Sequence, residues 1–218
     1  MALLHKATIV PSKLELLNHW LPTRPWAEGA GNVERVAAGR FDDPAGAVGI
    51  ETLILRAGDG RLLHVPLTYR DAPLDGAEQW LVGTTEHSVL GARWVYDAVG
   101  DPVYVAQLLD VIRSGGREAV EEFEVDGERQ SRVPDLALRG SGIPAGSVRA
   151  AGAAGAAGSV DAVGSVGSVT DGDPVVIALG DAELTVIRVP GPVPPGETLT
   201  GAWDGDGSPA VLATLTAR

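Results

Sequence analysis

The chain has 218 residues, of which 44% are hydrophobic and 21% are charged, so it is long and apolar enough to bury a sizeable core. Its formal net charge of -12 argues against nucleic acid and anionic membranes as partners, because both require a basic surface. The absence of cysteine excludes disulfides, thiolate metal sites and a cysteine nucleophile. No secretory leader and no apolar run of ~18 residues is found, so we expect a cytoplasmic protein.

The N-terminal pattern predicts a strand over 3–10 and then a helix over 12–21. Ser12 and Glu15 have the spacing of a capping box, in which each residue bonds the backbone of the other at the start of a helix. Two prolines follow in residues 21–26, and we expect an extended connector there.

Three strands are predicted next, at 33–41, 48–56 and 61–69, from their apolar and β-branched residues. The segment 81–97 predicts two further short strands that are interrupted near Gly91.

A second helix is predicted after Asp101 and Pro102, which suit the N-cap and the first helical position. Arg113 and Gly115 favour its end. Helices combined with antiparallel strands indicate an α+β fold.

The second half of the chain predicts antiparallel strands and a linker. Residues 118–139 suggest a hairpin around 126–127, and later hairpins turn at 180–181 and 204–207. Residues 140–173 are rich in Gly, Ala and Ser, so we expect a flexible linker or a disordered loop there.

One short segment, residues 83–98, concentrates side chains that donate, accept or stack. Its candidates are Glu86, His87, Arg93, Trp94, Tyr96 and Asp97. In a strand, adjacent residues point to opposite faces, which separates Glu86 from His87 as an acid/base pair. The same alternation places Trp94 and Tyr96 on one face. An aromatic face on a sheet is more often core or docking surface than a catalytic centre.

Motifs of nucleotide-binding and hydrolytic enzymes are absent from the sequence. It contains no G-x-G-x-x-G, Walker A or G-x-S-x-G pattern, and no two histidines have metal-ligand spacing. We therefore assign no catalytic, cofactor-binding or metal-binding residue.

Residues 3–115 resemble the N-terminal cap domain of actinobacterial maltokinases. The most specific segments are 48–53, 65–70 and 86–97. The resemblance implies a cystatin-like module for 1–115, an antiparallel sheet with packed helices. Residues 116–139 and 174–218 then look like a degenerate form of the following β lobe, which holds ATP in maltokinases.

The resemblance to that kinase β lobe departs from the family pattern at its phosphate-contacting lysine. Thr185 or Val186 stands where the lysine is expected. The helical lobe that carries catalysis in maltokinases is not found in the sequence. Phosphoryl transfer needs a phosphate clamp, a magnesium ligand and a base in one place, so family resemblance alone does not supply kinase activity.

Three functions remain open. The first is a non-catalytic, cap-like binding or regulatory module of maltose, trehalose or glucan metabolism. It would bind a protein partner through a surface formed by Trp20, Trp26 and the candidates in 83–98, without a cofactor. The second is the nucleotide-side component of a split sugar kinase, which would bind ATP and Mg²⁺. The third is a small sugar-binding module with Trp94 or Trp26 as a stacking platform.

Overall fold

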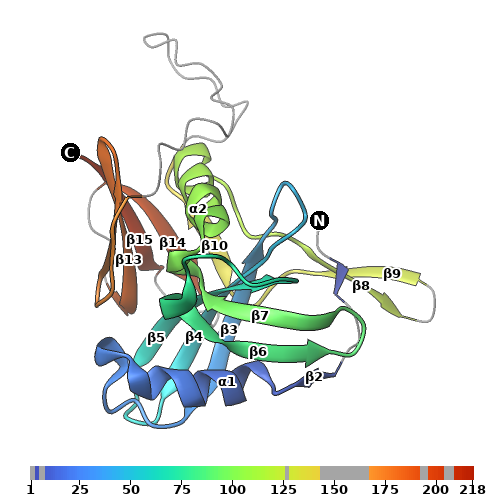
Figure 1. The fold of residues 1–218 in the computed structure, drawn as a ribbon. Coiled ribbons are helices and arrows are strands. Elements are labelled where there is room, and N and C mark those ends of the chain that lie inside the picture. Colours follow the sequence, from blue (N-terminus) through green and yellow to red (C-terminus); the bar gives the residue numbers. More distant parts are fainter. Residues whose placement is uncertain (1–2, 5–7, 126–127, 143–166, 192–195, 204–208) are drawn as a thin grey trace.

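The computed structural model describes residues 3–4, 8–125, 128–142, 167–191, 196–203 and 209–218 (Figure 1). Within these ranges the chain is rich in antiparallel β-sheet and has two α-helices, α1 and α2. The expected combination of helices with antiparallel strands is confirmed, and the cystatin-like detail stays a prediction. No helix in this described part has the length and apolar character needed to cross a membrane.

The N-terminal sheet is antiparallel and has the strand order β2-β6-β7-β5-β4-β3. The strands expected from residues 33–97 all form, within one residue of their predicted ends. Their bounds are β2 (Ile9–Val10), β3 (Val33–Phe41), β4 (Gly49–Ala57), β5 (Leu62–Arg70), β6 (Leu81–His87) and β7 (Gly91–Asp97).

Helix α1 (Lys13–Trp20) begins at the predicted capping box. Ser12 accepts a hydrogen bond from the backbone N–H of Glu15, and the Glu15 carboxylate accepts one from the backbone N–H of Ser12. The extended connector expected after it was wrong. Residues 21–27 form two 3₁₀ turns, η1 (Leu21–Thr23) and η2 (Pro25–Ala27), because each proline stands at a first-turn position where its missing N–H costs no hydrogen bond.

Helix α2 (Pro102–Ser114) also has its predicted ends. The Asp101 carboxylate accepts from the backbone N–H of Val103, and Gly115 closes the helix in the left-handed conformation at φ 67°. Two more 3₁₀ turns, η3 (Glu78–Trp80) and η4 (Ala98–Gly100), flank β6 and β7.

The C-terminal sheet has the order β10-β14-β15-β13-β12-β11, and its neighbouring strands are antiparallel. The predicted hairpin at 180–181 is confirmed, whereas the turns predicted at 126–127 and 204–207 lie outside the described residues. The strands are β10 (Ala137–Gly140), β11 (Val169–Thr170), β12 (Val175–Leu179), β13 (Ala182–Gly191), β14 (Glu197–Ala202) and β15 (Ala210–Ala217).

Two expectations about segment ends need correction. Gly140 and the pair Val169–Thr170, both assigned to the 140–173 linker, are strand residues that pair within the C-terminal sheet, and 143–166 lie outside the described residues. The single strand expected over 3–10 is divided. β1 (Leu3–Leu4) pairs with β8 (Glu121–Val125), which also pairs with β9 (Glu128–Arg132), whereas β2 joins the N-terminal sheet.

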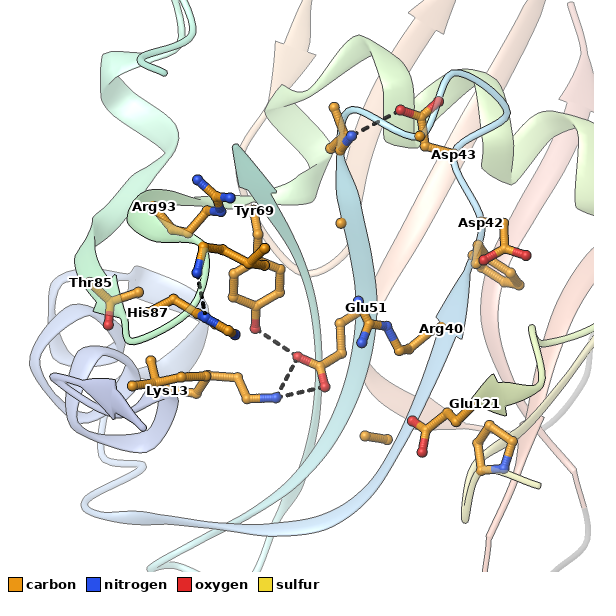
Figure 2. A pocket seen from close by; sticks show the side chains of 18 of the residues that line it. Lys13, Arg40, Asp42, Asp43, Glu51, Tyr69, Thr85, His87, Arg93 and Glu121 are labelled. Atoms are coloured by element: carbon orange, nitrogen blue, oxygen red, sulfur yellow. Dashed lines mark hydrogen bonds and ion pairs between the residues drawn. The ribbon is translucent and has the colours of Figure 1, made fainter. Parts of the chain in front are cut away.

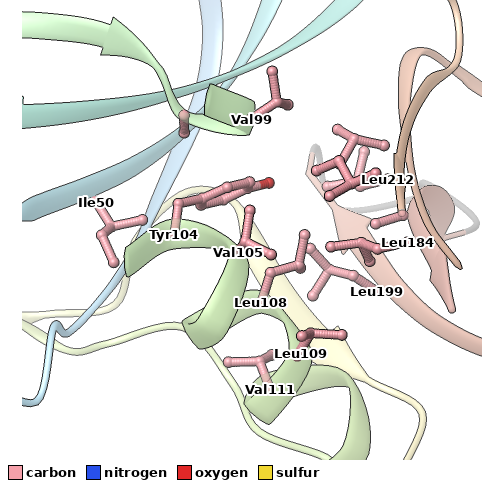
Figure 3. Close-up of a cluster of buried hydrophobic side chains, with 14 of the residues drawn as sticks. Ile50, Val99, Tyr104, Val105, Leu108, Leu109, Val111, Leu184, Leu199 and Leu212 are labelled. Atoms are coloured by element: carbon pink, nitrogen blue, oxygen red, sulfur yellow. The ribbon is translucent and has the colours of Figure 1, made fainter. Parts of the chain in front are cut away.

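The two faces of the N-terminal sheet enter different buried clusters. One face lies under α1, where Leu17 packs with Leu53 and Leu67. The opposite face packs, together with α2, against the C-terminal sheet. Figure 3 shows this shared cluster, in which α2 lies between Ile50 of β4 and Leu212 of β15. The hydrophobic core is therefore continuous from the N-terminal sheet through α2 to the C-terminal sheet.

Strand β10 passes so close to α2 that only glycine fits at residue 140. A Cβ there would overlap the carbonyl oxygen of Val111, whereas a Cβ at Gly191 has nothing within 4 Å. We expect Gly140→Ala to lower the free energy of unfolding by about 1–3 kcal/mol through overpacking. Urea denaturation measures the change, with Gly191→Ala as the matched control. Equal midpoints for the two variants would contradict this packing.

Candidate functional site

On the α1 side of the N-terminal sheet, the part that the helix covers is apolar. The part beyond the N-terminal end of the helix is polar. On β4, Glu51, Leu53 and Leu55 alternate with residues of the other face, so all three lie on the α1 side. The leucines are covered by α1. Glu51 lies past its N-terminal end, where Arg40 is its direct cross-strand partner on β3.

A cavity of about 810 Å³ opens over this polar part of the sheet (Figure 2). Its walls come from the start of α1, strands β3 to β7, the loop 42–48 and the segment 132–135. The volume lies within the range of small-molecule sites, roughly 300–1,000 Å³. This cavity is our candidate binding site.

Glu51 is at the centre of the cavity and is only 7% exposed. Lys13 Nζ donates to both of its carboxylate oxygens, at 2.7 and 2.8 Å, and the Tyr69 hydroxyl donates to Oε2 at 2.7 Å. Burial is the largest influence and by itself would raise the pKa of Glu51. The contacts with Lys13 and Tyr69 and the charge of Arg40 outweigh it and hold that pKa below its ordinary value. Glu51 is therefore ionised at neutral pH.

Several other charges of the cavity wall are already matched. Arg35 pairs with Asp135 at 2.8 Å, and Arg132 pairs with Glu121 at 2.6 Å. The Asp43 carboxylate accepts backbone N–H groups of the 45–48 loop. These contacts connect the rim residues to one another.

Arg40 differs from these rim residues. Its Nε is buried without a hydrogen-bond partner among the described residues. The side chain points toward Glu51, whose carboxylate is already engaged by Lys13 and Tyr69 (Figure 2). One carboxylate thus faces two cations at the floor of the cavity.

Two residues predicted from the 83–98 segment line this cavity, His87 and Arg93. His87 Nδ1 accepts the backbone N–H groups of Val89 and Leu90 and so shapes the turn between β6 and β7. Glu86 is exposed and lines a smaller neighbouring cavity together with His87. The structure therefore brings His87 and Arg93 to one site and leaves Glu86 at its outer edge.

The other predicted residues do not belong to an exposed face, and this corrects the docking surface inferred from sequence. Trp20 and Trp26 are each 6% exposed and pack edge to face at 5.9 Å between ring centroids. Tyr96 is buried, and its hydroxyl accepts the backbone N–H of Leu74. Trp94 is half-buried against the core on the same face as Tyr96. The aromatic residues thus build the interior.

Asp97 is completely buried as well, and it forms the joint between the two sheets. Arg188 of β13 is 0% exposed, donates through Nη2 to Asp97 Oδ2, and lies over the Trp26 ring at 4.4 Å. His64 of β5 contacts the neighbouring carbonyl oxygen of Ile187 through Nδ1 at 2.8 Å. We refer to Trp26, His64, Asp97 and Arg188 as the joint.

Burial dominates the electrostatics of the joint. It lowers the pKa of His64 to about 3, so this histidine is neutral and its Nδ1–H donates to Ile187. Burial also raises the pKa of Asp97, with Arg188 acting in the opposite direction. Arg188 Nε and Nη1 and Asp97 Oδ1 have no hydrogen-bond partner among the described residues. The ion pair must therefore offset a substantial desolvation cost.

Two residues important here were missed in the sequence, although each left a signal. Arg188 continues the inward-facing series Ala182, Leu184 and Val186 on β13, where a cation at a core position implies a buried partner. Glu51 is likewise a single carboxylate inside the apolar strand β4.

The residues that stand in place of the kinase lysine have structural roles. Val186 is 0% exposed and belongs to the core shared by both sheets, while Thr185 lies on the outer side of β13. No described residue of strands β10 to β15 lines either of the two cavities described above. Among the described residues, no three His, Asp or Glu side chains are grouped so as to hold a metal ion.

Strands β3 to β7 of the N-terminal sheet, which has α1 over one face, lie in the part of the chain that resembles a known protein family. Residues 20–101 match the family described as the maltokinase N-terminal cap domain. This part of the chain is similar to the maltokinase N-terminal cap domain, which confirms the resemblance found in the sequence. No curated protein matches the chain significantly.

The joint predicts a large cost for removing one partner of the ion pair. We expect Arg188→Met to lower the free energy of unfolding by about 3–5 kcal/mol, because Asp97 is then buried without its counterion. Asp97→Asn in the same chain should restore part of the loss. Urea denaturation of the single and double variants measures both effects.

The matched control for Arg188 is Arg218→Met. Arg218 pairs with Glu183 at the surface, with half of its side chain exposed, so the expected change is under about 1 kcal/mol. An Arg188→Met variant as stable as the Arg218→Met variant would contradict the role given to the joint.

The lowered pKa of His64 predicts that the protein loses stability in acid. Between pH 6.5 and about 3 the unfolded chain protonates this histidine while the folded chain does not. The free energy of unfolding therefore falls by about 1.4 kcal/mol per pH unit as the pH decreases through that window. His64→Asn can still donate to Ile187 and should flatten the slope.

Urea titrations between pH 6.5 and 4.5 measure the slopes of the wild type and the variants. His19→Asn is the control, since His19 is exposed. A slope unchanged by His64→Asn would show that His64 is not held neutral.

Proposed function

We propose that this chain is a non-catalytic binding or regulatory module associated with maltose, trehalose or glucan metabolism, acting in the cytoplasm. The observation that carries the proposal is the set of contacts that Arg188 makes. It is an inward-facing cation of the C-terminal sheet, and it is committed to Asp97 and covered by Trp26. A guanidinium held in this way connects the sheets and is not available to a phosphate.

The chemistry of phosphoryl transfer supports the same conclusion. A kinase must clamp the phosphates, hold Mg²⁺ and position the attacking group at one place. In the C-terminal sheet, the position expected for the clamp is taken by Thr185 or by Val186, and Val186 contributes its side chain to the core. The polar site of the chain instead lies over Glu51 and Arg40 of the N-terminal sheet.

A protein partner suits the exposed tip of the cap domain. Three large apolar side chains, Val10, Val89 and Leu90, are 61%, 56% and 45% exposed. They lie at the edge strand β2 and the turn between β6 and β7, next to Glu86 and His87. Exposed apolar residues with a polar border are typical of interaction surfaces. This tip replaces the larger aromatic surface inferred from the sequence.

Of the two alternative functions, the sugar-binding module has less support, because both tryptophans expected to stack on a sugar make other contacts. Trp26 is covered by Arg188, and Trp94 packs against the core. The nucleotide-side component of a split kinase makes a clear prediction, which is ATP binding with Mg²⁺.

The proposal predicts no phosphoryl transfer to maltose and no saturable binding of Mg-ATP. Isothermal titration of the purified chain with Mg-ATP, followed by a phosphorylation assay with maltose on the same sample, measures both. An active sugar kinase handled in the same way is the positive control. Turnover would contradict the proposal, and ATP binding without turnover would support the split-kinase alternative.

A further inference from the structure

We propose that the cavity over Arg40 and Glu51 binds a small hydroxylated molecule with one oxyanion group, a carboxylate or a phosphate ester. Arg40 and Lys13 would contact the oxyanion directly. This inference deepens the proposed binding role of the cap domain by naming the chemical class of its ligand.

The charge balance at the floor of the cavity is the first argument. Glu51 receives three hydrogen bonds, two from Lys13 and one from Tyr69. Arg40 is its cross-strand partner and adds a second positive charge beside the same carboxylate. These three charged groups leave one positive charge in excess at the floor of the cavity, and an oxyanion bound there neutralises it.

The unused donors are the second argument. Arg40 Nε is buried without a partner among the described residues, and a buried donor destabilises the fold unless an acceptor reaches it. A guanidinium presents donors in a planar fork that matches a carboxylate or a phosphate. Lys13 has three N–H donors and uses two of them on Glu51, so the third is available to the same oxyanion.

The walls indicate the rest of the ligand. Asp42 and Asp43 lie on one side of the cavity, and His87 and Arg93 lie on the other (Figure 2). Asp71 also lines it. Carboxylates accept hydrogen bonds from hydroxyl groups but repel a second anion, so the walls favour a molecule with several hydroxyls and one negative group. A cavity of about 810 Å³ has ample room for such a molecule.

Isothermal titration with three probes tests this inference. Glycerol 3-phosphate and glycerate each carry one oxyanion group and at least one hydroxyl, whereas glycerol carries hydroxyls alone. We expect saturable binding of at least one oxyanion probe, with an affinity at least about tenfold above that of glycerol, because hydrogen bonds to charged groups are the stronger ones. The tighter of the two oxyanions distinguishes a phosphate ligand from a carboxylate ligand.

Arg40 variants test the site itself. Arg40→Gln should weaken the tighter oxyanion by about tenfold to a hundredfold, as expected for losing a charge-assisted contact. Arg40→Lys keeps the charge without the fork and should fall between, which preserves the test if Arg40→Gln does not fold. The control is Arg113→Gln, an exposed residue at the end of α2, which should bind like the wild type.

The inference would be overturned if neither oxyanion binds the wild type, if glycerol binds equally well, or if affinity is the same in the Arg40 and Arg113 variants. These outcomes are independent of the ATP and maltose assays. Phosphoryl transfer would refute the non-catalytic function and leave the cavity result unaffected, so failure of either proposal can be recognised separately.

Discussion

The ion pair between Arg188 and Asp97 is the contact on which the relation of the two sheets depends. It joins strand β13 to the end of β7, and both side chains are completely buried. The core that the two sheets share is apolar, and apolar contacts specify proximity better than orientation. A buried pair with Trp26 on one side and His64 nearby resists displacement of the sheets, because separating the pair leaves both charges buried without a partner.

The two faces of the N-terminal sheet, which follow from strand alternation, have different uses. One face is used in the core with α2 and the C-terminal sheet, and it takes Trp94 and Tyr96. The other face is covered by α1 along only part of its area, because the helix begins at Lys13. The uncovered part can tolerate the charged residues Arg40 and Glu51, and it becomes a cavity. The same strands therefore provide a structural face and a binding face.

Much of the local structure could be predicted from the sequence, since capping residues, glycine turns and strand alternation act over a few neighbouring residues. The Ser12 box, the Asp101 cap and the strands of 33–97 are examples. The candidate site was recovered only through His87 and Arg93. Arg40 and Glu51 are eleven positions apart and meet through strand register, while Asp97 and Arg188 meet through packing of separate sheets. Such long-range pairing leaves no local pattern, so Asp97, Trp20 and Trp26 were placed on a surface when they are interior.

The central claim is that the cap domain and the C-terminal sheet form one cooperative unit held by the joint. Amide hydrogen exchange tests this most directly, because it reports the opening free energy of each strand. The account predicts the same opening free energy for the amides of β5 and β7 as for those of β13 and β15, equal to that of global unfolding. Exchange of β13 and β15 through a lower-energy opening, while β5 and β7 stay protected, would contradict it.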